Sequence, residues 1–260
     1  MTAINRPVES FQVTSDLVAE SDMLRLDAGF YNREAIEAIA LLKRSGMGVK
    51  TLGELAERVF IPPRFRRVYV DAARGVPFLQ GSHVVHFDPS DIKYLSKTAH
   101  VRLERWIIRS GWILITCSGT VGRVTMAPQQ WDGWAASQHI LRVIPEPDAA
   151  CPPGYLATFL ASPLGRVQLT ARIYGAVVDE LTEEQARSVL VPVAVTDEEQ
   201  EQVKRIDELA QRSVRQRGEA VRSAQEAMGR LTALLPQPEV PKAPHFEQFE
   251  NLANSLRRVP

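Results

Sequence analysis

Residues 109–123 read RSGWILITCSGTVGR and combine an uninterrupted apolar run with a glycine-containing turn. A short apolar run bounded by glycines is typical of a buried strand that ends in a tight turn. Further short apolar runs occur on both sides of this stretch, at residues 68–70, 76–79, 106–108, 121–126 and 139–144. Glycine and proline separate these runs, which indicates strands joined by turns. The sequence therefore predicts a β-rich core in the middle of the chain.

Helical patterns flank this core. Residues 32–44 (NREAIEAIALLKR) carry apolar side chains at helical spacing, and Thr51 is placed to cap a short helix carrying Leu52, Leu55 and Val59. After the core, residues 155–162 and 163–172 predict two short helices. Residues 182–185 (TEEQ) have capping-box spacing, and residues 188–195 are apolar and β-branched, as in a last strand.

One long helix is predicted after this last strand. Residues 196–199 (TDEE) form a second capping box, and no proline follows until Pro236. A helix of some 38 residues is roughly 57 Å long, more than a domain of this size needs for its own core, so we expect it to pack against another chain. Its predicted seam follows a 3-4 spacing, interrupted by Arg217, Gly218 and Gly229. The seam residues are Val203, Ile206, Ala210, Ser213, Ala220, Ala224, Ala227, Leu231 and Leu234.

These patterns predict an α+β protein with four segments. They are a helical lead-in (1–50), a β-rich domain with flanking helices (51–195), the long coiled-coil-type helix (196–235) and a proline-rich tail (236–260).

Composition excludes several classes of protein. Apolar residues make up 45% and charged residues 24% of the chain, which is ordinary for a folded domain. No apolar run reaches the roughly 18 residues of a membrane span, and the start lacks a signal-peptide pattern, so we expect a cytoplasmic protein. Cys117 and Cys151 are too few for a disulfide framework or a four-cysteine zinc site. We expect reduced thiols, no bound metal and no cofactor in this chain.

Charge is segregated along a chain whose formal net charge is zero. Residues 58–123 hold eleven Lys/Arg against four Asp/Glu, an excess of seven positive charges. Residues 180–260 hold fourteen acidic and eleven basic residues. A basic stretch of this kind favours a polyanionic partner, and the acidic half favours a different one.

Several segments, in this order, resemble the specificity subunit of type I restriction-modification enzymes. They are residues 26–31 (LDAGFY), 51–55 (TLGEL), 75–84 (GVPFLQGSHV), 109–123, 155–165, 174–175, 190–193 (LVPV) and 199–200, which opens the long helix. Trp112 departs from the family pattern, in which Asp is common at that position. The resemblance covers roughly residues 24–235.

The resemblance implies a target recognition domain at residues 51–195 and a spacer helix at residues 196–235. Members of the family normally carry two of each, whereas this sequence has one of each, as in a half-length form. Such a chain is expected to pair with itself or a similar chain and to read one half of a split double-stranded DNA site. The implied partners are a methyltransferase subunit, which supplies the S-adenosylmethionine chemistry, and in some systems a nuclease or helicase subunit. The chain itself is expected to be no enzyme.

Candidate DNA-binding residues come from the basic stretch and the polar ends of the strands. Cations bind phosphates, while side chains with donors and acceptors read base edges. Residues 118–123 also offer small side chains and backbone amides that suit a phosphate, although a hairpin turn needs the same glycines. The candidates are Arg64, Arg66, Arg67, Tyr69, Gln80, Ser82, His83, Lys93, Lys97, Ser118, Thr120, Arg123, Gln138 and His139.

Other interpretations of these residues remain open. Asp71, Asp91 and Lys93 have the composition of a Mg²⁺-dependent nuclease site, and Cys117 with His139 that of a nucleophile pair. Residues 61–65 (IPPRF) resemble a methyltransferase motif, but Ile61 cannot bond a target amine. His83 and His86 point to opposite faces of the expected strand, which makes a poor metal pair. An assembly adaptor without DNA specificity is a third class.

Overall fold

A computed structural model describes residues 32–86, 91–100, 102–147, 151–171 and 180–235, together with positions 15 and 19. The chain divides into two compact units, residues 1–219 and residues 220–260. Three sequence predictions lie outside the described residues: the family-like segment 26–31, the turn at 174–175 and the proline-rich tail.

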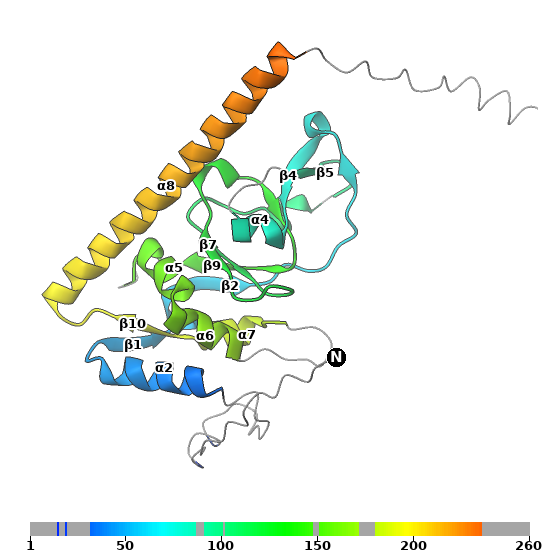
Figure 1. The fold of residues 1–260 in the computed structure, drawn as a ribbon. Coiled ribbons are helices and arrows are strands. Elements are labelled where there is room, and N and C mark those ends of the chain that lie inside the picture. Colours follow the sequence, from blue (N-terminus) through cyan, green and yellow to red (C-terminus); the bar gives the residue numbers. More distant parts are fainter. Residues whose placement is uncertain are drawn as a thin grey trace, which may run out of the picture. The chain divides into compact units, whose positions relative to one another are not determined.

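Three sheets organise the first unit (Figure 1). The central sheet is antiparallel and has the order β2 (Ala56–Phe60), β9 (Ile140–Pro145), β6 (Ile113–Thr116), β7 (Val124–Met126). The outer sheet has the order β3 (Tyr69–Val70), β5 (Lys93–Ser96), β4 (Gly75–Leu79), β8 (Ala135–Ala136), and only β4 and β8 run parallel. A two-stranded sheet pairs β1 (Gly48–Thr51) with β10 (Leu190–Val193), with Gly48 opposite Val193.

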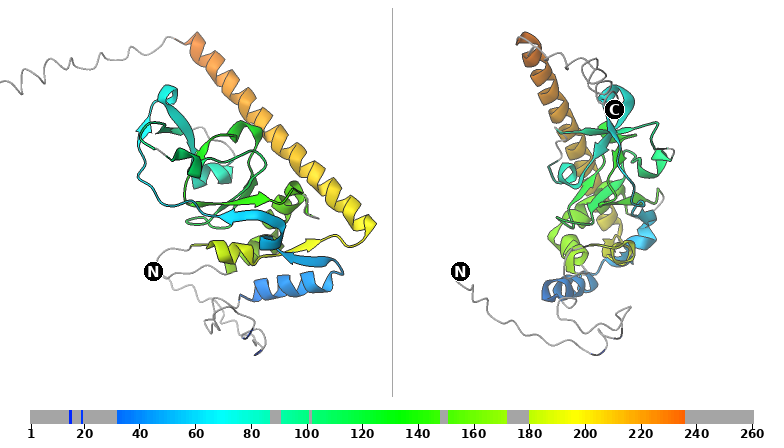
Figure 2. Two further views of the ribbon diagram at one scale, coloured as in Figure 1. Left: turned by 180° about the vertical axis from the view of Figure 1, so that it is seen from behind. Right: turned by 90° about the vertical axis from the view of Figure 1, so that its right-hand side faces the viewer.

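Seven named helices accompany these sheets in the described part of the chain (Figure 2). They are α2 (Arg33–Arg44), α3 (Leu52–Leu55), α4 (Gly81–His86), α5 (Pro153–Ala161), α6 (Pro163–Ala171), α7 (Glu183–Arg187) and α8 (Asp197–Leu234). Short 3₁₀ helices span Ala72–Arg74, Leu103–Trp106 and Gln129–Trp131. The α+β class and the long C-terminal helix predicted from the sequence are thus confirmed.

Strand β6 explains the apolar run within residues 109–123. Ile113 and Ile115 lie in the largest core cluster, together with residues of α5, α6 and β10. Leu114, which points to the opposite face, lies in a second cluster with Ile108 and Ile140. Because both faces of the central sheet are covered, the strand has no polar face.

The structure corrects several local predictions. Val59 lies in β2 and not in a helix, because pairing of Ala56 with Pro145 of β9 ends α3 after one turn. The predicted strand 106–108 is the end of a 3₁₀ helix followed by one isolated bridge between Ile107 and Ala135. Strands β1 and β5 and helix α4 were not predicted, because the two strands are short and pair with distant segments and α4 has only six residues.

The first half of α8 packs against its own domain, which corrects part of the predicted seam. Val203 is only 5% exposed and lies in the main core, with Ile206 and Val214 packed against it. Ala210 is half-buried beside Gly154, whose N–H donates to Asp207 Oδ1 over 2.7 Å. Val203, Ile206 and Ala210 are therefore used within the chain, because the helix lies along α5 before it continues beyond the first unit.

Gly218 marks the end of this intramolecular contact. A Cβ atom built there would lie 2.2 Å from Gln130 Nε2, so the helix backbone approaches the 3₁₀ helix Gln129–Trp131 closely. Sequence reasoning treated this glycine as a weakness in a coiled coil. In the structure it permits a close approach that a larger residue would obstruct.

Candidate nucleic-acid interface

The arginine-rich loop, residues 61–68, is anchored by an aromatic residue in its middle. The Phe65 ring lies 4.2 Å from the Trp106 ring and 5.4 Å from the His100 ring, measured between centroids. Trp106 Nε1 donates to the Pro63 carbonyl oxygen over 2.9 Å. Arg64 and Arg66, on either side of this anchor, are exposed. The loop therefore presents two arginines to solvent from a fixed backbone.

The next arginine in the loop reaches a segment 70 residues further along the chain. Arg67 Nη2 donates to Ser137 Oγ over 3.3 Å and to Gln138 Oε1 over 3.1 Å. Its guanidinium carbon lies 5.2 Å from the centroid of the Phe78 ring. Arg67 thus joins the loop to the turn between β8 and β9.

His139 continues this network to the glycine-containing turn. Its Nε2 lies 3.0 Å from Gln138 Nε2, and its Nδ1 bonds to Ser118 Oγ. An amide nitrogen can only donate, so Nε2 accepts and Nδ1–H donates to Ser118. Arg67, Ser118, Gln138 and His139 are called the polar cluster below. It brings together four of the predicted residues from three distant segments.

The environment keeps the His139 ring neutral at pH 7. Burial lowers the pKa of His139 below its ordinary 6.5, the cations Arg67 and Arg64 lower it further, and Glu180 acts in the opposite direction. A neutral ring agrees with the tautomer that the hydrogen bonds require.

Three of the six backbone amides in the turn at residues 118–123 donate within the turn or to Thr116. Val121 N–H donates to Gly119 O, Gly122 N–H to Thr116 O, and Arg123 N–H to Thr116 Oγ1. Gly119 and Gly122 have φ angles of +76° and +78°, which favour glycine. These three amides are not free to hold a phosphate, so the predicted phosphate contact is wrong for them and stays a prediction for the other three. The exposed Thr120 and half-buried Arg123 remain candidates by their side chains.

Helix α4 begins at Gly81, directly after Gln80, where a loop was predicted to follow the strand. The His83 ring is buried, and its Nδ1 accepts the Gln80 N–H over 3.1 Å. His83 is therefore a helix-start residue within the core and not a surface contact, whereas Ser82 is exposed. The idea that His83 and His86 lie on a strand is also wrong, since both belong to α4.

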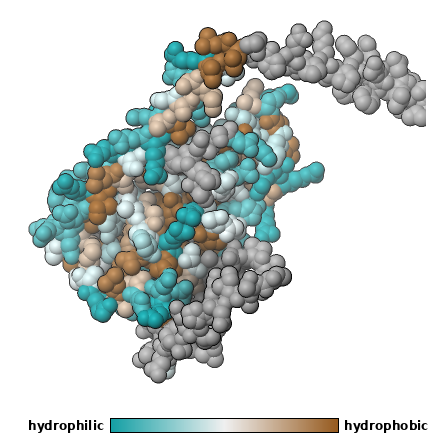
Figure 3. Space-filling model, in the orientation of Figure 1, coloured by the Kyte–Doolittle hydropathy of each residue, from teal (hydrophilic) through white to brown (hydrophobic). Residues whose placement is uncertain are grey.

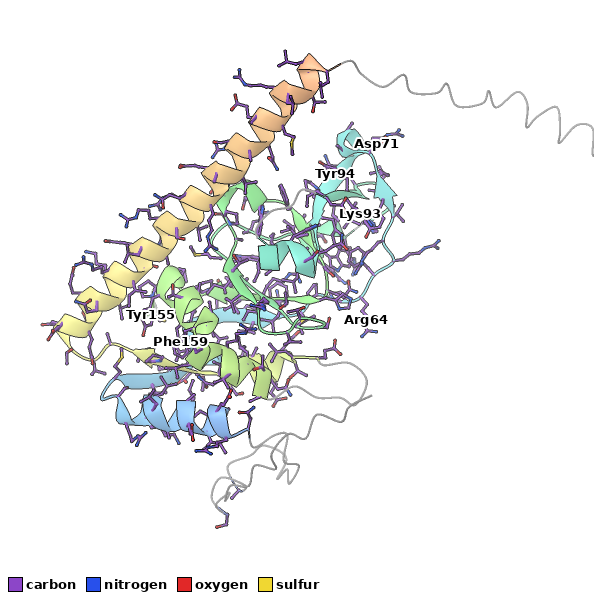
Figure 4. The ribbon with its side chains drawn as sticks, in the orientation of Figure 1. Arg64, Asp71, Lys93, Tyr94, Tyr155 and Phe159 are labelled. Carbon is purple, nitrogen blue, oxygen red and sulfur yellow. The ribbon has the colours of Figure 1, made fainter. Side chains whose placement is uncertain are left out.

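The outer sheet carries the remaining candidates. Tyr69 and Lys93 are exposed neighbours on β3 and β5, with the Lys93 ammonium 5.4 Å from the Tyr69 ring centroid, and Lys97 is exposed just after β5. Asp71 accepts from Arg74 Nη2 over 2.8 Å. Figure 4 shows Asp71 and Lys93 on this sheet and Arg64 on the separate loop.

Two observations of the described residues bear on the enzymatic alternatives. The described residues contain no group of three or more His, Cys, Asp or Glu arranged to hold a metal ion. Burial raises the pKa of the Cys117 thiol to about 12. This thiol donates to the Gln138 carbonyl, while the His139 ring bonds to other groups, so the two side chains do not form a nucleophile pair.

Within the described part of the chain, no helix is both long and apolar enough for a membrane span.

Sequence reasoning missed Arg142, which lies beneath the polar cluster. Its side chain is fully buried in β9 and donates to backbone carbonyls of the turn that carries Gln138 and His139. The signal was present in the sequence, because residues 140–145 (ILRVIP) place one charged residue in an apolar strand.

The second unit offers a different surface. Ala220, Ala224, Ala227, Leu231 and Leu234 of the predicted seam are all exposed, and Leu234 is 83% exposed. Apolar residues colour the end of α8 in Figure 3, where Met228 and Leu235 are also exposed. This part of the helix carries no apolar core of its own.

Comparison with known proteins points to one family. A family model described as "Type I restriction modification DNA specificity domain" matches residues 46–221. A search of curated proteins finds no match.

The solved structures that match include the following three chains. One, from a structure concerned with complex assembly and conformational transition of the type I R-M system, is 16% identical with a TM-score of 0.47, and the match covers 78% of this chain and 50% of that one. The HsdS subunit from Thermoanaerobacter tengcongensis is 14% identical with a TM-score of 0.44, covering 86% and 51%. The type I restriction-modification S subunit from M. genitalium is 14% identical with a TM-score of 0.45, covering 79% and 53%. The chain spans about half the length of each.

Proposed function

Because the chain belongs to the family of type I restriction-modification DNA specificity domains, we propose that it reads one half of a split site in double-stranded DNA for a separate modifying enzyme. The observation that carries this proposal is the polar cluster next to the anchored arginine loop. Glutamine and arginine are the side chains that read adenine and guanine in pairs of hydrogen bonds. Exposed arginines on a fixed loop suit the phosphates on either side.

Exposed and half-buried residues of the interface have different roles in this proposal. Arg64 and Arg66 are exposed and unconstrained by the cluster, so they contact phosphates and supply affinity. Gln138 and Arg67 are half-buried and oriented by each other, so they contact base edges and supply specificity. Lys93, Lys97 and Tyr69 extend the cationic surface along the outer sheet.

The partners belong to the same proposal. A methyltransferase subunit supplies S-adenosylmethionine and the chemistry, and a nuclease or helicase subunit joins in a restriction complex, all in the cytoplasm. A second copy of the chain, or a similar chain, provides the other half-site. The exposed residues Ala220, Ala224, Ala227, Leu231 and Leu234 suit this pairing, because an exposed apolar face on a helix is stabilised by a partner helix.

Selection from a pool of randomised duplexes tests the proposal. The purified full chain, alone and with its co-purified partners, should enrich a consensus and bind that duplex at least about a thousandfold more tightly than a scrambled one. Binding without sequence preference indicates an assembly adaptor instead. Mg²⁺-dependent cleavage by the chain alone indicates a nuclease.

A further inference from the structure

Arg142 is a charged residue in β9, an interior strand of the central sheet. Its backbone pairs with Phe60 of β2 and Leu114 of β6, and its side chain is completely buried. Burial lowers its pKa to about 9, which still leaves it charged at pH 7. In the described part of the chain no carboxylate forms a salt bridge with it. A buried charge without a counter-ion is costly unless hydrogen bonds compensate it.

Three of the hydrogen bonds that the guanidinium donates go to one short segment. Nη1 donates to the carbonyl oxygens of Ser137, over 2.9 Å, and Ile140. Nη2 donates to the Ala136 carbonyl over 2.6 Å. These three residues enclose Gln138 and His139, which lie on the turn where the chain passes from the outer sheet to the central one.

Backbone bonds secure the same turn at other points. Ser137 N–H donates to Leu79 O over 2.9 Å, and Cys117 N–H donates to His139 O over 3.0 Å. Of the three residues whose carbonyls Arg142 binds, Ala136 pairs with Leu79 and Ile140 pairs with Thr116, whereas Ser137 lies between the two sheets and its carbonyl also accepts the Ile140 N–H. The side chain therefore adds hydrogen bonds to the backbone where the chain passes from one sheet to the other.

A fourth bond links Arg142 to Trp106, which in turn supports the arginine-rich loop. Its Nη2 lies 3.4 Å from the Trp106 carbonyl oxygen, and Trp106 is the residue that holds Phe65 and Pro63. One planar group thus contacts the supports of both halves of the candidate interface. Lysine cannot do the same, because its donors radiate from a single nitrogen.

We propose that Arg142 is a positioning residue that sets the turn carrying Gln138 and His139 against the loop carrying Arg67, and thereby determines sequence discrimination by this site. The inference rests on the proposed function. Arg142 itself touches no DNA, so its loss should reduce discrimination while non-specific binding through exposed cations persists.

The experiment compares wild type, Arg142→Lys and Arg142→Met in the full chain. The probes are the consensus duplex selected by wild type and a scrambled duplex of equal length. Arg142→Met should lower the affinity ratio between them by about tenfold or more, and binding to the scrambled duplex should change by less than about twofold. The affinity ratio of Arg142→Lys should lie between those of wild type and Arg142→Met, because lysine keeps the positive charge but has only part of the hydrogen-bond donors of the guanidinium. An unchanged ratio in Arg142→Met overturns the proposal.

A double-mutant cycle separates positioning from general stability. If Arg142 acts through the turn, Arg142→Met should add little to the loss of discrimination already caused by Gln138→Ala. Full additivity of the two losses contradicts the proposal. If Arg142→Met does not fold, the same cycle is made with Arg142→Lys.

A second readout needs no DNA. Titration of the His139 ring by NMR should show its pKa rising toward 6.5 in the Arg142 variant, because a displaced ring loses its burial and its proximity to Arg67. An unchanged titration overturns the positioning role. A wild-type chain that selects no consensus contradicts the proposed function instead, and the titration then still decides whether Arg142 positions the turn.

Discussion

Arg67 Nη2 donates to Gln138 Oε1 over 3.1 Å, across 71 residues of sequence. This bond joins an arginine from the loop between β2 and β3 to the turn between β8 and β9. It orients the amide of Gln138 toward His139 and, through His139, toward Ser118. The four residues of the polar cluster therefore form one connected network.

Replacing Gln138 by Ala should reduce sequence discrimination. We expect the preference for the selected duplex to fall by about 1–3 kcal/mol, because one side chain with two hydrogen-bonding atoms is lost from a base edge. Competition binding against the scrambled duplex measures this. The matched control is Gln129→Ala, an exposed glutamine on a 3₁₀ helix, which should leave the preference intact. Equal effects of the two variants would exclude Gln138 as a reader.

Replacing Arg64 and Arg66 together by Ala should weaken binding to every duplex alike. Each lost phosphate contact reduces the slope of log affinity against log salt by about 1, so the double variant should lose about 2. Binding isotherms at several salt concentrations test this. Lys43→Ala with Arg44→Ala removes the same charge from exposed positions of α2 and should leave the slope unchanged. A wild-type slope in the Arg64/Arg66 variant would place the phosphate face elsewhere.

Stability should depend on pH through His139. Its pKa is depressed in the folded chain, so the unfolded chain takes up a proton first as pH falls. The contribution of His139 to stability is therefore complete above pH 6.5 and is lost as pH decreases below it. Urea unfolding at pH 7.5 and pH 5.5 should show a smaller loss for His139→Gln than for wild type. An identical loss in both would contradict the neutral ring described above.

Gly165→Ala should destabilise the fold. A Cβ atom there would lie 2.2 Å from the Phe159 carbonyl oxygen and 2.7 Å from Leu160 Cα, which are backbone atoms that cannot turn aside. We expect the free energy of unfolding to fall by about 2 kcal/mol. Gly229→Ala is the control, since nothing lies within 4 Å of that position and alanine favours the helix. Urea unfolding of both variants distinguishes a packing effect from a general intolerance of glycine substitution.

Pairing should depend on the exposed end of α8. Leu231→Glu with Leu234→Glu should convert the paired form to single chains, because charges replace 54% and 83% exposed apolar side chains on the proposed contact face. Sedimentation velocity provides the measurement. Ser223→Glu with Gln225→Glu adds the same charge off the 3-4 series and should leave the chains paired. If both variants stay paired, another surface holds the chains together.

Local features of the structure were predictable from sequence. Asn32 accepts amide hydrogens from Glu34 and Ala35 at the start of α2, and Thr182 with Gln185 forms the predicted capping box before α7. These patterns are readable because each bond joins residues within one helical turn. The β-rich core and the long α8 follow from hydrophobic period and from the absence of proline.

The interface was predictable only as a set of residue types. The basic loop and residues 138–139 were identified, but their contact through Arg67 depends on two sheets meeting. His83 was misplaced, because its burial follows from the unpredicted α4. Val203 was assigned to a partner, since an apolar helix face does not specify whether its own domain or another chain covers it.

Residue order alone determined the β-rich centre, the helix caps and the extent of α8, because those features depend on neighbours a few positions apart. Packing decided which half of α8 faces inward, that Arg142 reaches the turn of Gln138, and that Arg67 bonds to it. The physical reason is that hydrogen bonds and burial between distant segments exist only once the sheets have assembled, and no spacing along the chain encodes them.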